Sequence, residues 1–332
     1  MKQFIIKILL FTLLFFIIDR SYIVFRYNET NIFADIASEK MLTIKSSFHS
    51  KKNFDVLIFG SSHAQFGVSP TIIHQYSGLK CLNIAYGDGA NIGKQLNLLK
   101  HLVNSKNSKI PKTIFFGMDV FTLNNTPVYN DQFQDILFGK EHYNNFKHLK
   151  SYITLYSRFI PRYLKDFKNN KYSLPYFRGD DSYDLSMFNQ FQKYDITEFG
   201  WVKGYGILNP TYIRYAEISF SPNKKALIDL EDFISVCKTN NIELIFFQTP
   251  ENEVCLKYNQ KYDDFNEFMN ELSHHSSVRY IDYNTLGKFP VNNDSLFFDS
   301  DHLNISGAKL FTNSLVKDIL NNARTHNNVY TK

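Results

Sequence analysis

Cysteine is scarce in this chain of 332 residues, and its placement excludes a metal site built on cysteine. Cys81, Cys237 and Cys255 lie in unrelated segments, without the paired spacing that such sites use. Cys81 falls in an apolar run and is expected to be a small core residue. A disulfide between Cys237 and Cys255 stays open if the domain lies outside the cytoplasm. Because no segment concentrates histidines and carboxylates, the sequence implies no metal ion and no organic cofactor.

Charge of one sign is not concentrated either. The formal net charge is +5, and the lysines and arginines are scattered through asparagine-rich segments, so we expect no nucleic-acid binding. Charged residues make up 21% of the chain and apolar ones 44%, a balance that excludes a largely disordered protein. Glycine is sparse at 14 residues, whereas 32 phenylalanines and 21 tyrosines form an aromatic excess. This excess suits a protein that faces carbohydrate or membrane, and an AT-rich genome would produce it as well.

The amino terminus has the layout of a membrane signal. An apolar run from Ile8 to Ile18, interrupted only by Thr12, follows Lys2 and Lys7. The residues after it offer no small-residue cleavage site, so we expect residues 1–26 to stay as an uncleaved single-pass anchor. Lysines before the run favour an orientation with the remaining chain outside the cytoplasm, although two arginines beyond the run weaken it. The alternative is a buried amphipathic helix of a soluble domain, which the lack of a polar face disfavours.

Beyond the anchor, short apolar runs alternate with segments of helical periodicity. This alternation predicts an α/β domain with a parallel sheet. We expect strands at 55–59, 81–85, 113–116, 242–247 and 279–282, and helices at 92–103, 226–237, 262–272 and 306–320, the last capped by Ser306. The expected organisation is a linker at 27–54, a core at 55–121 and 225–322, an insertion at 122–224 and a tail at 323–332. The insertion is expected to be mostly helical and to act as a lid or substrate-binding region.

A serine follows the first expected strand, in the segment Gly60-Ser61-Ser62-His63. In an open parallel sheet, ligands bind beyond the carboxyl ends of the strands. A serine at such a strand-to-helix turn is presented above the sheet, where backbone N–H groups can stabilise an oxyanion. Taken alone, the segment is more often ordinary turn chemistry.

An aspartate and a histidine precede the last expected helix, three residues apart. The carboxylate of Asp299 can hold the Nδ1 proton of His302, which leaves Nε2 free to take a proton from a serine. Alone, this loop would be read as a surface loop with a turn-capping aspartate. Because Ser62 follows the first strand and this pair precedes the last helix, the three residues together predict a catalytic triad.

These two segments resemble a known family, the SGNH or GDSL-like hydrolases. Residues Val56–Ser62 are similar to the family's Gly-Asp-Ser block, with Ser61 in place of the aspartate, and Asp299–His302 are similar to its Asp-x-x-His block. The resemblance implies a flavodoxin-like three-layer sandwich around a parallel sheet. It also implies that Ser62 is the nucleophile, with Asp299 and His302 as its partners.

The family's other two blocks match less well. Gly87 is similar to its oxyanion glycine and would act with the backbone N–H of Ser62, with Gly89 as an alternative; a glycine needed only for a positive-φ turn is the other explanation. Where members often carry an oxyanion asparagine, this chain has Asp119, whose carboxylate would repel a developing negative charge. We expect Asp119 and Gln248, both at the active edge of the sheet, to contact the substrate. The departures resemble a membrane-associated branch with alginate-type O-acetylation and teichoic-acid D-alanylation proteins.

His63 directly follows the expected nucleophile. Adjacent residues on a turn usually point apart, so we do not expect His63 to be the base.

The sequence therefore predicts a membrane-anchored serine acyltransferase, of acetyl groups above all. Its acceptor would be an envelope or exported polysaccharide, and an integral membrane protein would supply the acyl group. An esterase that cleaves carbohydrate or lipid esters would need the same triad, with water as the acceptor. A catalytically inactive scaffold that binds polysaccharide or a partner complex is the third alternative.

Overall fold

The computed structural model describes most of the expected core and parts of the expected anchor, linker, insertion and tail. The described residues are 11–12, 14, 40, 43–44, 47–48, 53–87, 91–104, 110–124, 194–197, 199–208, 219–258, 262–285 and 287–327. Within these ranges, no helix is both long enough and apolar enough to cross a membrane. The expected anchor lies almost entirely outside the described residues and stays a prediction.

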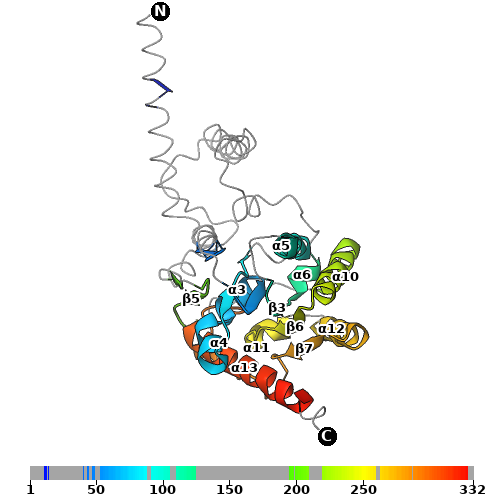
Figure 1. Ribbon diagram of the computed structural model, residues 1–332. Helices are drawn as coiled ribbons and strands as arrows, with labels where there is room; N and C mark the ends of the chain where they lie inside the picture. The colour runs from blue at the N-terminus through cyan, green and yellow to red at the C-terminus, as the bar shows by residue number, and fades with distance from the viewer. Residues whose placement is uncertain are drawn as a thin grey trace, which may run out of the picture.

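A five-stranded parallel sheet forms the centre of the domain (Figure 1). Its strand order is β2-β1-β3-β6-β7, and every neighbouring pair is parallel. Numbered along the sheet alone, this is the doubly wound order 2-1-3-4-5 of flavodoxin-like folds. The expected α/β fold with a parallel sheet is confirmed. The strands are β1 (Val56–Gly60), β2 (Cys81–Asn83), β3 (Thr113–Gly117), β6 (Glu243–Gln248) and β7 (Arg279–Asp282).

The three central strands could be read from the sequence because both of their faces are buried. Every residue of β1 is buried, and β3 and β6 are buried in all but their first residue. Strands covered on both sides form continuous apolar runs. The boundaries of all five strands accordingly lie within two residues of those expected.

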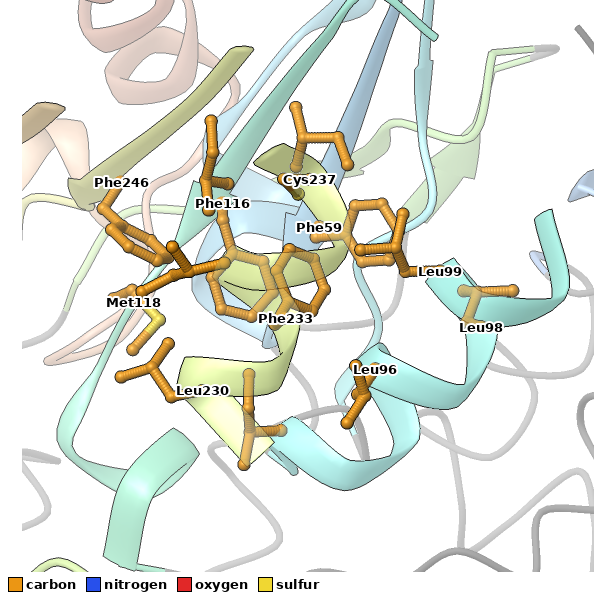
Figure 2. Close-up of a cluster of buried hydrophobic side chains, with 14 of the residues drawn as sticks. Phe59, Leu96, Leu98, Leu99, Phe116, Met118, Leu230, Phe233, Cys237 and Phe246 are labelled. Carbon is orange, nitrogen blue, oxygen red and sulfur yellow. The ribbon is translucent and has the colours of Figure 1, made fainter. Parts of the chain in front are cut away.

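Three helices, α5 (Ile92–Asn104), α10 (Lys224–Thr239) and α12 (Tyr262–Ser276), cover one face of the sheet (Figure 1). Figure 2 shows how phenylalanines of the sheet meet the apolar sides of α5 and α10. The ring of Phe233 on α10 lies 5.5 Å from that of Phe59 and 5.1 Å from that of Phe116, between centroids. Packed aromatic rings of this kind fix the helices against the sheet.

The opposite face is covered by α3 (Ser62–Gly67), α4 (Pro70–Ser77), α11 (Glu253–Tyr258) and α13 (Ile305–Asn327). Thr312 ties α13 to the corner between α3 and α4. Its Oγ1 accepts a hydrogen bond from the backbone N–H of Ser69 at 3.0 Å and donates to the carbonyl oxygen of Gly67 at 3.2 Å. The last helix therefore lies directly against the helix that begins at Ser62.

The described part of the insertion includes a two-stranded antiparallel sheet, β4 (Tyr194–Ile196) and β5 (Val202–Gly204). The mostly helical insertion that we expected stays a prediction, because residues 125–193, 198 and 209–218 lie outside the described part. Trp201 is buried and donates from Nε1 to the carbonyl oxygen of Phe66 at 2.8 Å. The hairpin is thereby fastened to the end of α3.

Asn304, and not Ser306, caps α13. Its Oδ1 accepts hydrogen bonds from the backbone N–H groups of Ser306 and Gly307, each at 3.0 Å. The expected Ser306 cap was wrong, because asparagine caps at least as well and stands two positions earlier. The three cysteines are all free, so Cys237 and Cys255 form no disulfide.

Candidate active site

Ser62 stands where β1 turns into α3. β1 ends at Gly60, whose φ of +134° is a conformation that side-chain-bearing residues rarely adopt. Ser61 then caps α3, with its Oγ accepting a hydrogen bond from the backbone N–H of His63 at 3.3 Å. Since the strand order reverses between β1 and β3, this turn lies at the switch point where sheets of this kind bind ligands.

The structure brings His302 and Asp299 to Ser62. His302 Nε2 lies 2.8 Å from Ser62 Oγ, and His302 Nδ1 lies 2.9 Å from Asp299 Oδ2. Asp299 Oδ1 also accepts hydrogen bonds from the backbone N–H groups of His302 at 2.7 Å and Asp301 at 3.0 Å. The carboxylate is thus held on the ring nitrogen that faces away from the serine. The order serine, imidazole, carboxylate is the one that general-base activation requires.

Aromatic side chains fix the ring of His302. Phe298 stacks on it with 5.4 Å between centroids and an interplanar angle of 5°, and Phe66 meets it edge-on at 5.5 Å. These contacts come from the loop before α13 and from α3. The ring is therefore held by the two elements that it has to connect.

Carboxylates govern the charge of His302. Burial lowers the pKa of His302, but Asp299 and Asp301 outweigh this effect and hold the pKa well above its ordinary value. Burial raises the pKa of Asp301, but His302 and His63 outweigh it and hold that pKa well below its ordinary value. The site therefore favours the imidazolium that forms once His302 has taken a proton.

A cavity of about 220 Å³ opens beside the serine hydroxyl. Gly87 forms part of its wall, and a Cβ built on Gly87 would lie 3.9 Å from the Cβ of Ser62. Gly87 is not among the positive-φ residues of the described chain, so its backbone does not require a glycine. Its place beside Ser62 suits an oxyanion donor, whereas Gly89 lies outside the described residues. The lining residues are Ser61, Ser62, His63, Gly87, Asp119, Phe121 and Asp301.

Asp119 lies in the cavity wall, but its oxygens already have partners. Oδ1 accepts hydrogen bonds from the backbone N–H and the Oγ1 of Thr122, both at 2.9 Å, and Oδ2 accepts one from Ser61 Oγ. The carboxylate caps the short helix α6 (Val120–Asn124) and fixes the turn before Ser62. Ser61 and Asp119, the two departures from the family's blocks, are thus direct partners of each other.

Gln248 is not among the residues that line the cavity. It is 1% exposed, and its Oε1 accepts hydrogen bonds from the hydroxyl groups of Tyr262 at 3.2 Å and Tyr280 at 3.0 Å. Gln248 therefore lies in a buried hydrogen-bond network at the end of β6. A role in substrate contact stays a prediction from the sequence.

The sequence interpretation missed two residues of the site, His63 and Asp301. Both line the cavity, and His63 Nε2 lies 3.3 Å from Asp301 Oδ2. Contrary to the expectation that His63 points away, its ring centroid lies 4.9 Å from that of His302. Only the docking of α3 against the loop before α13 brings these side chains together. Nothing in the local sequence pattern could have indicated the pairing.

His63, Asp301 and His302 are the one group in the described chain whose ligand atoms lie close enough to share an ion. Their nitrogens and oxygens are already bonded to one another, to Asp299 and to Ser62. A cation there would draw His302 away from Ser62. The grouping therefore suits proton transfer better than a resident metal.

Comparisons with solved structures give several matches. The chain is similar to a G-D-S-L family protein. That protein, from Desulfitobacterium hafniense DCB-2, is described as lipolytic and is one of 15 solved chains that match. The alignment has 12% identity and a TM-score of 0.37, and covers 80% of this chain and 99% of that one. A protein-family model matches residues 214–324, and no curated protein matches the sequence.

Proposed function

We propose that this protein is a serine-dependent acyl-ester enzyme of the SGNH type, with Ser62 as its nucleophile. One observation carries the proposal: His302 Nε2 lies 2.8 Å from Ser62 Oγ while Asp299 holds Nδ1 of the same ring. A serine hydroxyl becomes an effective nucleophile when an adjacent base takes its proton. The arrangement supplies that base and fixes its tautomer.

The reaction proceeds in two halves. In the first, His302 takes the proton of Ser62, the serine oxygen attacks the acyl carbonyl, and His302 returns the proton to the leaving oxygen. The backbone N–H groups of Ser62 and Gly87 are the proposed donors to the oxyanion. The acyl group then rests as an ester on Ser62. In the second half, His302 takes the proton of an acceptor hydroxyl, whose oxygen attacks this ester. The bond between the acyl group and Ser62 breaks, and His302 returns the proton to the Ser62 oxygen.

Acyl transfer to an envelope or exported polysaccharide is the proposed overall reaction. Phe121 lies in the cavity wall and keeps 36% of its surface exposed, so an aromatic face is available beside the acyl-enzyme. Aromatic faces stack on sugar rings. The amino-terminal run supports an anchor in the cell membrane with the domain outside the cytoplasm, beside an integral membrane protein that donates the acyl group.

The esterase alternative uses the same first half, with water as the acceptor. The fully assembled triad weighs against an inactive scaffold, because a binding protein has no need of a base bonded to a serine.

Labelling with a fluorophosphonate tests the enzymatic proposal. The full-length protein in detergent should be labelled, and Ser62→Ala should lose the label. Ser77→Ala is the matched control, since Ser77 lies on α4 and bonds the carbonyl oxygen of Ile73 at 2.6 Å, outside the cavity. Equal labelling of wild type and Ser62→Ala would refute the proposal.

A second experiment separates transfer from hydrolysis. The full-length protein is incubated with an activated acetyl ester and an oligosaccharide, and the products are separated by mass spectrometry. Acetylated sugar supports the transferase, whereas free acetate without sugar ester supports the esterase. In the transferase, Phe121→Ala should raise KM for the sugar several-fold, the loss of one stacking contact, and leave hydrolysis of the acetyl ester nearly unchanged.

A further inference from the structure

His63 is held between two carboxylates at the edge of the cavity. Its Nε2 lies 3.3 Å from Asp301 Oδ2 and its Nδ1 lies 3.5 Å from Asp119 Oδ2. A neutral imidazole can donate from one ring nitrogen only, whereas the imidazolium donates from both. The side chain is 7% exposed, so water competes little for either nitrogen. This two-sided contact favours the cation.

Asp301 is shared between two histidines. While its Oδ2 faces His63, its Oδ1 lies 3.2 Å from His302 Nδ1, the nitrogen that is already bonded to Asp299. Nδ1 carries a single hydrogen and cannot serve two carboxylates equally. Two anions at one imidazole would also hold it protonated. A protonated His302 cannot take the proton of Ser62.

We propose that His63 is a positioning residue: as a cation between Asp119 and Asp301 it competes with His302 for the Asp301 carboxylate, so that Asp299 stays the main ring partner of His302. The inference rests on the proposed function and adds a second histidine to its machinery. His63 also acts directly, because the two rings lie 4.9 Å apart and repel each other when both are protonated. Both effects oppose the rise in the pKa of His302 that Asp299 and Asp301 cause.

Among the described residues, Glu251, which follows β6, is a further titratable group that interacts with His63. Burial raises the pKa of Glu251 to about 7, and the charge of His63 opposes that rise. Glu251 Oε2 accepts a hydrogen bond from Cys255 Sγ at 3.4 Å. Below neutral pH, Glu251 is therefore mostly uncharged and does not replace Asp119 or Asp301 as the partner of His63.

The pH dependence of fluorophosphonate labelling tests the role of His63 without any knowledge of the substrate. Labelling requires a neutral His302, so its rate rises with pH through the titration of that ring. His63→Gln should move the rise to higher pH and reduce labelling at pH 6.5 by on the order of tenfold. At high pH, labelling should recover. Asp301→Asn removes the competing anion, so it should move the rise to lower pH. The double variant should return toward wild type.

A merely structural role would not move these profiles. His63→Gln with an unshifted rise, or Asp301→Asn with an unshifted rise, would overturn the inference. Asp301 has a side chain that is 30% exposed, so its variant provides the test if His63→Gln does not fold. NMR titration of the His302 ring in full-length protein should show the same shifts without any reaction. If wild type is not labelled, the proposed function fails, and the NMR titration still decides the role of His63.

Discussion

Gly60 and Gly117 are register partners at the carboxyl ends of β1 and β3, and neither position has room for a side chain. A Cβ on Gly60 would lie 2.7 Å from the carbonyl oxygen of Gly117, and a Cβ on Gly117 would lie 2.7 Å from the Cβ of Ala64. Because both positions lack a side chain, α3 can begin immediately after β1. The position of Ser62 above the sheet is therefore set by two glycines that take no part in chemistry.

Gly60→Ala should destabilise the protein strongly. The φ of +134° and the contacts with Gly117 and Ala64 act together, so we expect a loss of about 2–4 kcal/mol in the free energy of unfolding. Urea unfolding followed by the fluorescence of Trp201, the single tryptophan, measures it. Gly78→Ala is the matched control. Gly78 has a φ of +71° but nothing within 4 Å of its Cβ, so its loss should be only about 1 kcal/mol.

Unlike Gly60→Ala, Gly87→Ala should reduce activity and leave the stability of the protein nearly unchanged. The new methyl group would meet Ser62 Cβ at 3.9 Å, an ordinary contact, and the backbone has no positive φ, so stability should change by less than about 1 kcal/mol. The methyl group enters the cavity beside the nucleophile. Fluorophosphonate labelling should fall by on the order of tenfold, about the loss of half an oxyanion contact. A variant that unfolds, or one that is labelled like wild type, would contradict the role assigned to Gly87.

Triad variants should be non-additive. Ser62→Ala, or His302→Gln, should each reduce ester cleavage by on the order of 10³-fold or more, and the double variant should be little worse than either. The reason is that the hydroxyl and the imidazole act as one unit across their 2.8 Å contact. Steady-state rates with an activated acetyl ester give the comparison. Losses that multiply in the double variant would mean that His302 acts on something other than Ser62.

The sequence predicted those features that depend on burial and on strand ends. β1, β3 and β6 are apolar on both faces, so their positions were readable, and parallel strands bring their carboxyl ends to one edge. That geometry is why residues as far apart as Ser62 and His302 could be paired. Features that depend on how helices and loops dock were missed. The contact of His63 with Asp301 is one such feature.

The docking of Trp201 on α3 is another feature that no local sequence pattern predicted. Trp201 is 3% exposed, and its Nε1 donates to the carbonyl oxygen of Phe66. Trp201→Phe keeps an aromatic ring but leaves that carbonyl without its donor, which should cost about 1–3 kcal/mol. Urea unfolding followed by circular dichroism measures the loss. An unchanged midpoint would show that this hydrogen bond contributes nothing to the stability of the protein.

Glu251→Gln should stabilise the protein at alkaline pH more than at acidic pH. Glu251 is 5% exposed, and burial raises its pKa to about 7 in the folded state, against about 4.3 for a glutamate in an unfolded chain. Between these values the unfolded state releases a proton that the folded state keeps, so a rise in pH favours unfolding. The loss of stability reaches its full size above pH 7, where Glu251 is ionised in both states and the folded protein holds a buried charge. Glutamine cannot ionise, so the variant does not lose this stability.

The size of the Glu251 effect follows from the same shift. The gain of Glu251→Gln over wild type should be about 2.5 kcal/mol larger at pH 8 than at pH 5, in urea unfolding at the two pH values. Glu253→Gln is the matched control, because Glu253 lies two positions away with a side chain that is 47% exposed and paired with Lys257. Its effect should be small at both pH values. Equal effects of Glu251→Gln at pH 5 and pH 8 would mean that the carboxyl group ionises in the folded protein as easily as in water.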